Sequence, residues 1–263
     1  MRPFLALVRK EFLCLFGAPT AYLTLTMVAL VTAIVFFEHL RLYNQVLFVF
    51  ASSNMGGFDT DAIPDYVNLW DSVFFPVMDA LGIMLLATIP LITMRVFAEE
   101  RSRGTDELLV TTHLTPAKIV LAKFLVTFTF IFLTLSFSFV YPAAAIEQGG
   151  IGAEHLTAVY VGLLALGMGV ASLGLVCSAF TSSQLVAAVT GWALAFVLWD
   201  FTWANAFLNE GTAAFLETLA MQPRYSAFAE GIVGLENIAY FFGLALLSMA
   251  VARFSFDLRR LGT

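Results

Sequence analysis

Apolar residues gather in long runs along the 263-residue chain, and short polar stretches separate these runs. A helix that spans a bilayer needs about 20 mostly apolar residues. Runs of this kind occupy Pro19–Phe37, Ser72–Met94, Pro116–Ile146, Leu156–Phe180, Leu185–Ala204 and Gly231–Ala252. The pattern therefore predicts an all-α integral membrane protein with six transmembrane helices.

The polar stretches predict how these helices are connected. The uncharged run from Leu156 to Trp199 is too long for one crossing, so the polar residues 181–184 are expected to form the turn of a helical hairpin. Residues 1–18 are expected to form an interfacial helix, and the partly apolar residues 205–232 short helices at the opposite surface. Because six is an even number, both ends of the single domain 1–263 lie on the same side.

Composition agrees with a membrane protein. Hydrophobic residues make up 60% of the chain, whereas apolar residues are about 45–50% of a soluble domain. The mean hydropathy is +0.89. Cys14 and Cys177 lie within apolar runs, so we expect small packing residues and no disulfide.

Basic residues predict the orientation, because cytoplasmic segments of membrane proteins are enriched in Lys and Arg. With the N-terminus inside, 11 of the 13 basic residues fall on the cytoplasmic side, and only Arg41 and Arg224 fall outside. The net charge of −6 is therefore the sum of two opposed faces, and it gives no indication of nucleic-acid binding. We expect both termini and residues 97–116 to be cytoplasmic.

The segment 97–116 concentrates charge in a chain that is only 12% charged. Gly104 can end the preceding helix in a left-handed conformation, and Thr105 can cap a new short helix. Glu107 then lies in the first turn of that helix, and Leu108 and Leu109 provide an apolar face. Two interpretations are open: a solvated interfacial loop, or a helix that docks in a groove of another protein.

Other chemistry is sparse in the sequence. The chain has no G-x-x-x-x-G-K-[ST] phosphate loop, and His39, His113 and His155 have no metal-ligand partner at helical spacing. Asp79 is the only acid well within a predicted crossing, whereas ion-driven transporters usually bury ionisable residues at depth. The sequence therefore predicts no catalytic, cofactor-binding or metal-binding residues, and any transport would draw its energy from elsewhere.

Small residues recur four positions apart in the predicted fourth helix, in the pairs Ala165/Gly169, Gly167/Ala171 and Gly174/Ser178. Such faces allow helices in a membrane to approach closely. They could serve contact with a second copy of the chain or packing within one bundle.

Three stretches resemble the permeases of type 2 ABC exporters: Ile89–Phe124, the N-terminal VRKEFLCLFGAPTAYLTL and Pro223–Phe241. The last of these is similar to the gliding-motility-associated (GldF-like) and NosY-like branch. In the first, the matching positions are Glu99, Glu100, Arg101, Gly104, Thr105, Glu107, Leu108, Leu109 and Lys123.

The resemblance implies a permease subunit of the bacterial cytoplasmic membrane. It implies that residues 97–116 are a coupling segment docking on a separate ATPase subunit, which binds the ATP, and that a second permease completes the transporter as a homodimer or heterodimer. We expect Leu108 and Leu109 to anchor this contact and Glu99, Glu100, Arg101 and Arg103 to set its register. Two alternatives stay open: a non-transporting anchor that couples an ATPase to an envelope machine, and a secondary transporter or channel.

Overall fold

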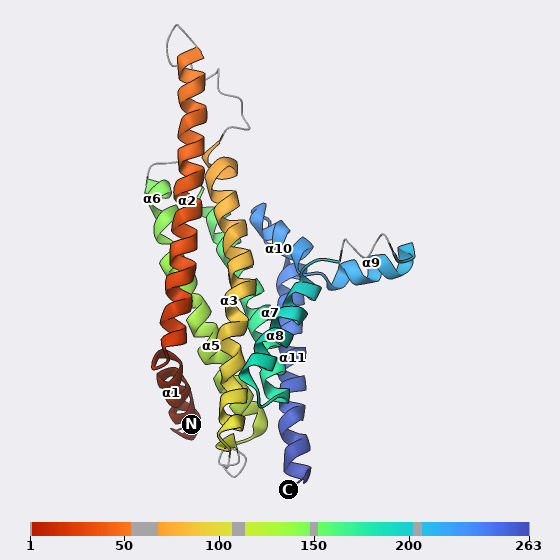
Figure 1. The fold of residues 1–263 in the computed structure, drawn as a ribbon. Helices are drawn as coiled ribbons and strands as arrows, with labels where there is room; N and C mark the ends of the chain where they lie inside the picture. The colour runs from red at the N-terminus through yellow and green to blue at the C-terminus, as the bar shows by residue number, and fades with distance from the viewer. Residues whose placement is uncertain (1, 54–67, 107–113, 148–151, 202–206, 263) are drawn as a thin grey trace.

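The computed structural model describes residues 2–53, 68–106, 114–147, 152–201 and 207–262, and all regular structure within them is helical (Figure 1). In chain order the helices are α1 (Arg2–Phe16), α2 (Pro19–Ser53), a π-helical turn (Trp70–Phe74) that runs into α3 (Phe75–Ser102), α5 (Pro116–Ser138), α6 (Val140–Glu147), α7 (Ala153–Phe180), α8 (Gln184–Trp199), α9 (Glu210–Leu219), α10 (Gln222–Ala229) and α11 (Leu235–Gly262). The predicted all-α membrane fold is confirmed.

Five helical segments in the described residues are long and apolar enough to cross a membrane, rather than the predicted six: Pro19–Phe50, Trp70–Ser102, Pro116–Ala143, Ala153–Phe180 and Leu235–Leu258. The remaining predicted crossing, Leu185–Ala204, corresponds to α8, an apolar helix of 16 residues. Such a helix is about 24 Å long, short of the roughly 30 Å of a hydrocarbon core. The difference arises because apolar composition continues past Trp199, whereas the helix ends there.

Helix α2 is much longer than the predicted crossing Pro19–Phe37. The sequence-based boundary followed the first charges, Glu38 and Arg41, yet the helix continues to Ser53. Charge ends an apolar run but does not break a helix, and no Gly or Pro lies between Pro19 and Ser53 to do so. The first part of the segment between the first two predicted crossings is therefore an extension of α2.

The predicted third crossing, Pro116–Ile146, is interrupted near its end. Helix α5 ends at Ser138, and α6 begins at Val140. Pro142 has no backbone N–H with which to reach the carbonyl four residues earlier, which belongs to Ser138, so the ladder breaks here. The Ser138 hydroxyl hydrogen-bonds the Leu135 carbonyl oxygen and lies 3.1 Å from the Tyr160 hydroxyl oxygen of α7.

Helix α7 is the central helix of the bundle and contacts α3, α5, α8, α10 and α11. Its small residues make this possible. A methyl group at Gly167 would lie 2.7 Å from the Ile131 side chain, and one at Gly174 would lie 2.1 Å from the Thr93 hydroxyl oxygen. The small-residue faces therefore serve packing within one bundle, which was one of the two interpretations of the sequence.

The predicted hairpin turn before α8 is also present. The Ser183 hydroxyl caps α8 by accepting from the Val186 N–H at 3.4 Å.

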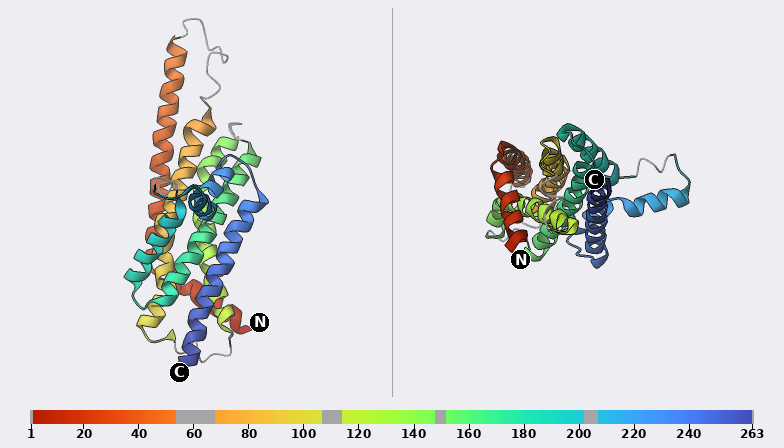
Figure 2. Two further views of the ribbon diagram at one scale, coloured as in Figure 1. Left: turned by 90° about the vertical axis from the view of Figure 1, so that its right-hand side faces the viewer. Right: turned by 90° about the horizontal axis from the view of Figure 1, so that it is seen from below.

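The start of α1, the end of α11, the end of α3 and the start of α5 lie at the same end of the bundle, as the predicted topology requires (Figure 1). Although α8 is short, it runs back from this end antiparallel to α7, so the chain still returns for α11. At the other end, the predicted short helices before the last crossing are α9 and α10. Helix α9 projects sideways from the bundle in Figure 1 and in the right-hand view of Figure 2. Helix α10 instead packs inward, where Tyr225 and Phe228 are buried and the Tyr225 hydroxyl donates to the Met78 carbonyl oxygen at 2.9 Å.

Candidate functional site

The predicted coupling segment divides into a described and an undescribed part. Glu99 and Glu100 lie in the last turns of α3, followed by Arg101, Arg103, Gly104 and Thr105. Glu107, Leu108 and Leu109 lie outside the described residues, and so does the docking helix expected from them. The prediction that these nine residues contact an ATPase stays a prediction.

Gly104 ends α3 in the way that the sequence predicts. Its φ is +68°, a left-handed value that favours glycine. The Thr105 N–H donates to the Glu100 carbonyl oxygen at 2.9 Å, and the Gly104 N–H donates to the Arg101 carbonyl oxygen at 3.2 Å. These two bonds form a Schellman motif. The Thr105 hydroxyl also donates to the Glu100 carbonyl oxygen at 3.2 Å, and the helix that it is expected to cap lies outside the described residues. Thr105 thus fixes the end of α3.

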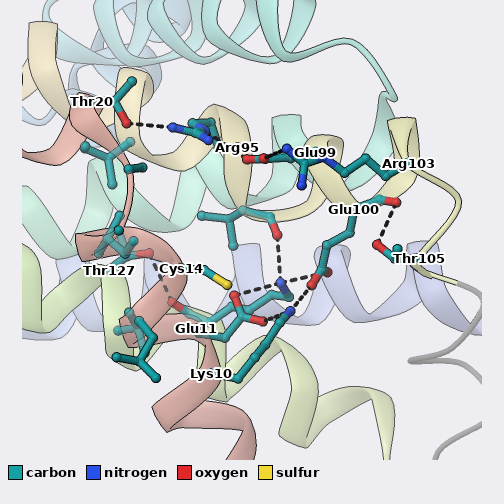
Figure 3. Close-up of a pocket in the computed structure, with 18 of the residues that line it drawn as sticks. Lys10, Glu11, Cys14, Thr20, Arg95, Glu99, Glu100, Arg103, Thr105 and Thr127 are labelled. Atoms are coloured by element: carbon teal, nitrogen blue, oxygen red, sulfur yellow. Dashed lines mark hydrogen bonds and ion pairs between the residues drawn. The ribbon is translucent and has the colours of Figure 1, made fainter.

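Glu100 joins three helices through a buried ionic network (Figure 3). The Lys123 ammonium of α5 lies 2.8 Å from a Glu100 carboxylate oxygen and 3.0 Å from a Glu11 carboxylate oxygen of α1. Lys10 of α1 closes the ring, at 2.9 Å from the other oxygen of Glu11 and in contact with Glu100. Lys123 also donates to the Val96 carbonyl oxygen at 2.7 Å. The two ammonium groups and two carboxylates balance in charge.

Burial makes this network costly to disrupt. The Lys123 side chain is 0% exposed, and those of Glu11 and Glu100 are 9% and 15% exposed. Ion pairs shielded from water attract more strongly, yet each ion has lost its hydration, so none can be left unpaired without a large cost. At Lys10, burial disfavours the charged form, but hydrogen bonds to Glu100 and Glu11 outweigh it and raise the pKa above the ordinary lysine value.

Glu99 forms a second, more exposed set of contacts on the same helix end. The Arg95 Nε atom donates to one Glu99 oxygen at 2.8 Å, and an Arg103 guanidinium nitrogen lies 2.7 Å from the other. Arg95 also donates to the Thr20 hydroxyl oxygen at 2.9 Å, at the start of α2. Of these residues, Arg103 is the most solvent-accessible, with 70% of its side chain exposed.

Arg101 and the residues before it connect α3 to α7 and α11. Arg101 donates to the Ala179 carbonyl oxygen at the end of α7. One turn earlier, the Ser178 hydroxyl oxygen accepts from the backbone N–H groups of Phe97 and Ala98, each at 3.0 Å. The Phe97 ring lies against the Phe256 ring of α11, with centroids 5.2 Å apart. The charged end of α3 is therefore held by four other helices, α1, α5, α7 and α11, and by the first turn of α2.

Sequence reasoning placed Glu99, Glu100, Arg101 and Arg103 together. It missed Lys10, which pairs with Glu100, and Glu11, which pairs with Lys10 and Lys123. The signal available was Lys123, a lysine within the apolar run 116–146 and thus in need of an anion. Which anion it finds depends on α1 folding back beside α5, which local pattern does not reveal. Among the described residues, no group of three or more His, Cys, Asp or Glu side chains could hold a metal ion.

A cavity of about 710 Å³ adjoins these contacts, and it is lined by α1, the first residues of α2, the charged end of α3 and residues 123–127 of α5 (Figure 3). Its walls combine the charged residues above with apolar side chains such as Leu13, Ile92 and Val126. Cys14 also lines it and is exposed, contrary to the expected packing role, whereas Cys177 is partly buried. Both cysteines are free thiols, as predicted.

The helical bundle, with its long apolar helices and its charge at one end, defines a multi-pass membrane protein. The sequence model of the ABC-2 family transporter protein matches residues 51–208, more than half of the chain, and the chain belongs to this family. It is thus a permease component of an ABC transporter. No curated protein matches the chain. The matched range includes the end of α3 and Lys123 but excludes Lys10 and Glu11.

Proposed function

We propose that this chain is the membrane-spanning subunit of an ABC exporter in a bacterial cytoplasmic membrane, driven by ATP that a separate ATPase subunit hydrolyses. The observation that carries the proposal is the way in which the end of α3, just before the predicted coupling helix, is held in the bundle. The end of α3 is bound to α1, α5, α7 and α11, and it lies at the same end of the bundle as the start of α1 and the end of α11 (Figure 1). A partner that moves the end of α3 moves five helix ends together.

The contacts divide the proposed docking residues by role. The carboxylates of Glu99 and Glu100 and the guanidinium of Arg101 are bound within the chain, so they hold the segment in place. Arg103 is largely exposed, so among the described residues it is the strongest candidate to contact a partner directly. Leu108 and Leu109 remain the proposed apolar anchors, because a few buried apolar residues usually dominate an interface. Charge at Arg103 would then favour the correct partner and register.

The test is affinity purification of the tagged chain from its own membranes in mild detergent. We expect an ATP-binding-cassette ATPase to co-purify and its hydrolysis to be stimulated by the chain. Leu108→Asp should abolish both while leaving the chain folded, and Arg103→Glu should weaken both. A matched control is Phe207→Asp, which makes the same kind of change at a side chain that is 81% exposed beside α9.

Unchanged co-purification of Leu108→Asp would refute the docking site. Exporter function needs a second measurement, in which ATP drives solute movement in vesicles that contain the permease–ATPase complex. Stimulated hydrolysis without movement of any of the solutes tested would favour the anchor alternative. We further propose that two permease subunits form the pathway, since one bundle is packed around α7. A single permease per complex, measured by mass, would contradict this.

A further inference from the structure

The cavity beside α1 combines a cationic and an apolar wall. Its charged side is formed by Lys10, Arg95 and Arg103, together with the acids of the ionic contacts, and its apolar side includes Leu13, Ile92 and Val126. Its volume of about 710 Å³ is in the range of small-molecule sites, roughly 300–1,000 Å³. This pairing suits a ligand that carries an anionic group and an apolar portion on one molecule.

Three of the basic side chains that line the cavity are more exposed than the acidic side chains that line it. Lys10, Arg95 and Arg103 expose 46%, 27% and 70% of their side chains, but Glu11, Glu99 and Glu100 expose only 9%, 20% and 15%. The lining residues include four basic and three acidic side chains, a net charge of +1. Lys123 is fully buried, so the basic groups open to a ligand are those of Lys10, Arg95 and Arg103, each of which already has an acidic partner.

The cations are also held in position before any ligand binds. Arg95 is fixed by Glu99 and by the Thr20 hydroxyl, at 2.8 and 2.9 Å, and Lys10 is fixed by Glu11 and Glu100. A guanidinium group whose geometry is preset loses less conformational freedom on binding a phosphate and can donate to two of its oxygens. The site thus resembles a receptor for a phosphate group more than a flexible cationic surface.

The position of the cavity indicates the source of this phosphate. The cavity lies at the elbow between α1 and α2, formed by Gly17, Ala18 and Pro19, where the apolar window of α2 begins. Helix α1 exposes large apolar side chains, among them Leu5 and Leu13, as helices that lie in a membrane interface do. Lipid headgroups, with their phosphates, lie in the interfacial layer of a bilayer.

We propose that this cavity binds the headgroup phosphate of an anionic phospholipid from the leaflet that contacts α1, with Arg95, Arg103 and Lys10 around the phosphate and the acyl chains along Leu13 and Val126. The occupied cavity would connect α1 to the end of α3 by a lipid in addition to the ion pairs. The proposal concerns this chain alone and does not depend on an ATPase.

The chain contains its own reporter, because Cys14 is exposed and lines the cavity. In a Cys177→Ser background, the rate at which a maleimide modifies Cys14 is measured in delipidated protein with added mixed micelles. We expect phosphatidylglycerol to slow the reaction at least about fivefold and phosphatidylcholine to leave it nearly unchanged. Inorganic phosphate and glycerol phosphate at equal concentration should give no protection.

Variants then assign the protection to the named cations. Arg95→Gln with Arg103→Gln should raise the phosphatidylglycerol concentration that gives half-protection by about 25-fold, since each basic residue near an anionic lipid contributes about fivefold. Arg103→Gln alone should give about fivefold and serves if the double variant does not fold. Arg9→Gln is the matched control, because Arg9 is exposed on α1 but does not line the cavity.

Three outcomes would overturn the proposal. Equal protection by phosphatidylcholine would show that charge does not select the ligand. Protection by inorganic phosphate alone would assign the site to a free anion and not to a lipid. A shift with Arg9→Gln as large as that with Arg103→Gln would show general surface attraction in place of a defined site.

Discussion

Replacing Lys123 of α5 by methionine should destabilise this protein more than removing any other single charge from the ionic network that joins α1, α3 and α5. The ammonium group touches Glu100 at 2.8 Å, Glu11 at 3.0 Å and the Val96 carbonyl oxygen at 2.7 Å, and its side chain is fully buried. Methionine fills a similar volume but removes the charge, so two largely buried carboxylates share the single remaining cation, Lys10. Removing one partner of a buried ion pair costs about 3–5 kcal/mol.

The measurement is thermal unfolding of detergent-solubilised protein. At about 2–4 °C per kcal/mol for a chain of this size class, Lys123→Met should lower the melting temperature by roughly 10 °C. Lys118→Met is the matched control, because Lys118 lies on the same helix but is exposed, and surface substitutions change stability by about 0.5 kcal/mol or less.

A rescue variant separates charge imbalance from lost packing. Adding Glu100→Gln to Lys123→Met leaves Lys10 paired with Glu11, one cation with one anion, and should restore at least about half of the lost stability, because an uncompensated buried charge dominates the penalty. Equal melting temperatures for Lys123→Met and Lys118→Met would refute the reasoning. Failure of the rescue would show that packing and the Val96 hydrogen bond carry the effect.

Three further predictions concern packing, backbone and topology. Gly162→Ala should cost about 1–3 kcal/mol because its methyl group would lie 2.4 Å from Phe228 Cβ, whereas Gly243→Ala, with nothing within 4 Å, should be neutral or stabilising in the same thermal assay. Gly104→Ala should cost about 1 kcal/mol through its φ of +68° alone, since its methyl group meets no atom within 4 Å. Gly104→Asn should cost less, because Asn tolerates this conformation better, and equal stability of the parent and both variants would contradict a backbone origin. A cysteine at Ser102 should react only with reagent on the cytoplasmic side and one at Ser52 only from outside, and the reverse pattern would invert the topology.

The positions of the apolar helices and of their turns followed from the sequence because they depend on local pattern. Gly104 was placed correctly at the end of α3, since a left-handed C-terminus selects glycine whatever the helix packs against. Helix length was less predictable. The extension of α2 to Ser53 and the end of α8 at Trp199 depend on helix breakers and tertiary neighbours, which hydropathy does not measure.

The charged residues at the end of α3 show a different limit of sequence reasoning. Their concentration between Phe97 and Glu107 was apparent, but the partners of Glu100 come from residues 10 and 123, which lie 90 positions before it and 23 after it. Pairing over such separations is decided by how α1 and α5 pack. The interleaved charges therefore indicated that the segment makes specific contacts. That many of these contacts lie within the chain depends on how the helices pack.

This internal pairing bears on how the proposed coupling could work. If the α3–α5 connection were loosely attached, a partner ATPase would displace the connection without moving the helices behind it. Instead, separating α3 from α1 and α5 requires breaking ion pairs around a fully buried lysine, which costs several kcal/mol. Bending the segment relative to α7 would also break the bonds to Ser178 and Ala179. Displacement at the connection is therefore cheaper as a joint movement of the helix ends than as local bending. Charge within the bundle supplies the stiffness, and Arg103, which is 70% exposed, is the most accessible of the described ion-paired residues at this helix end.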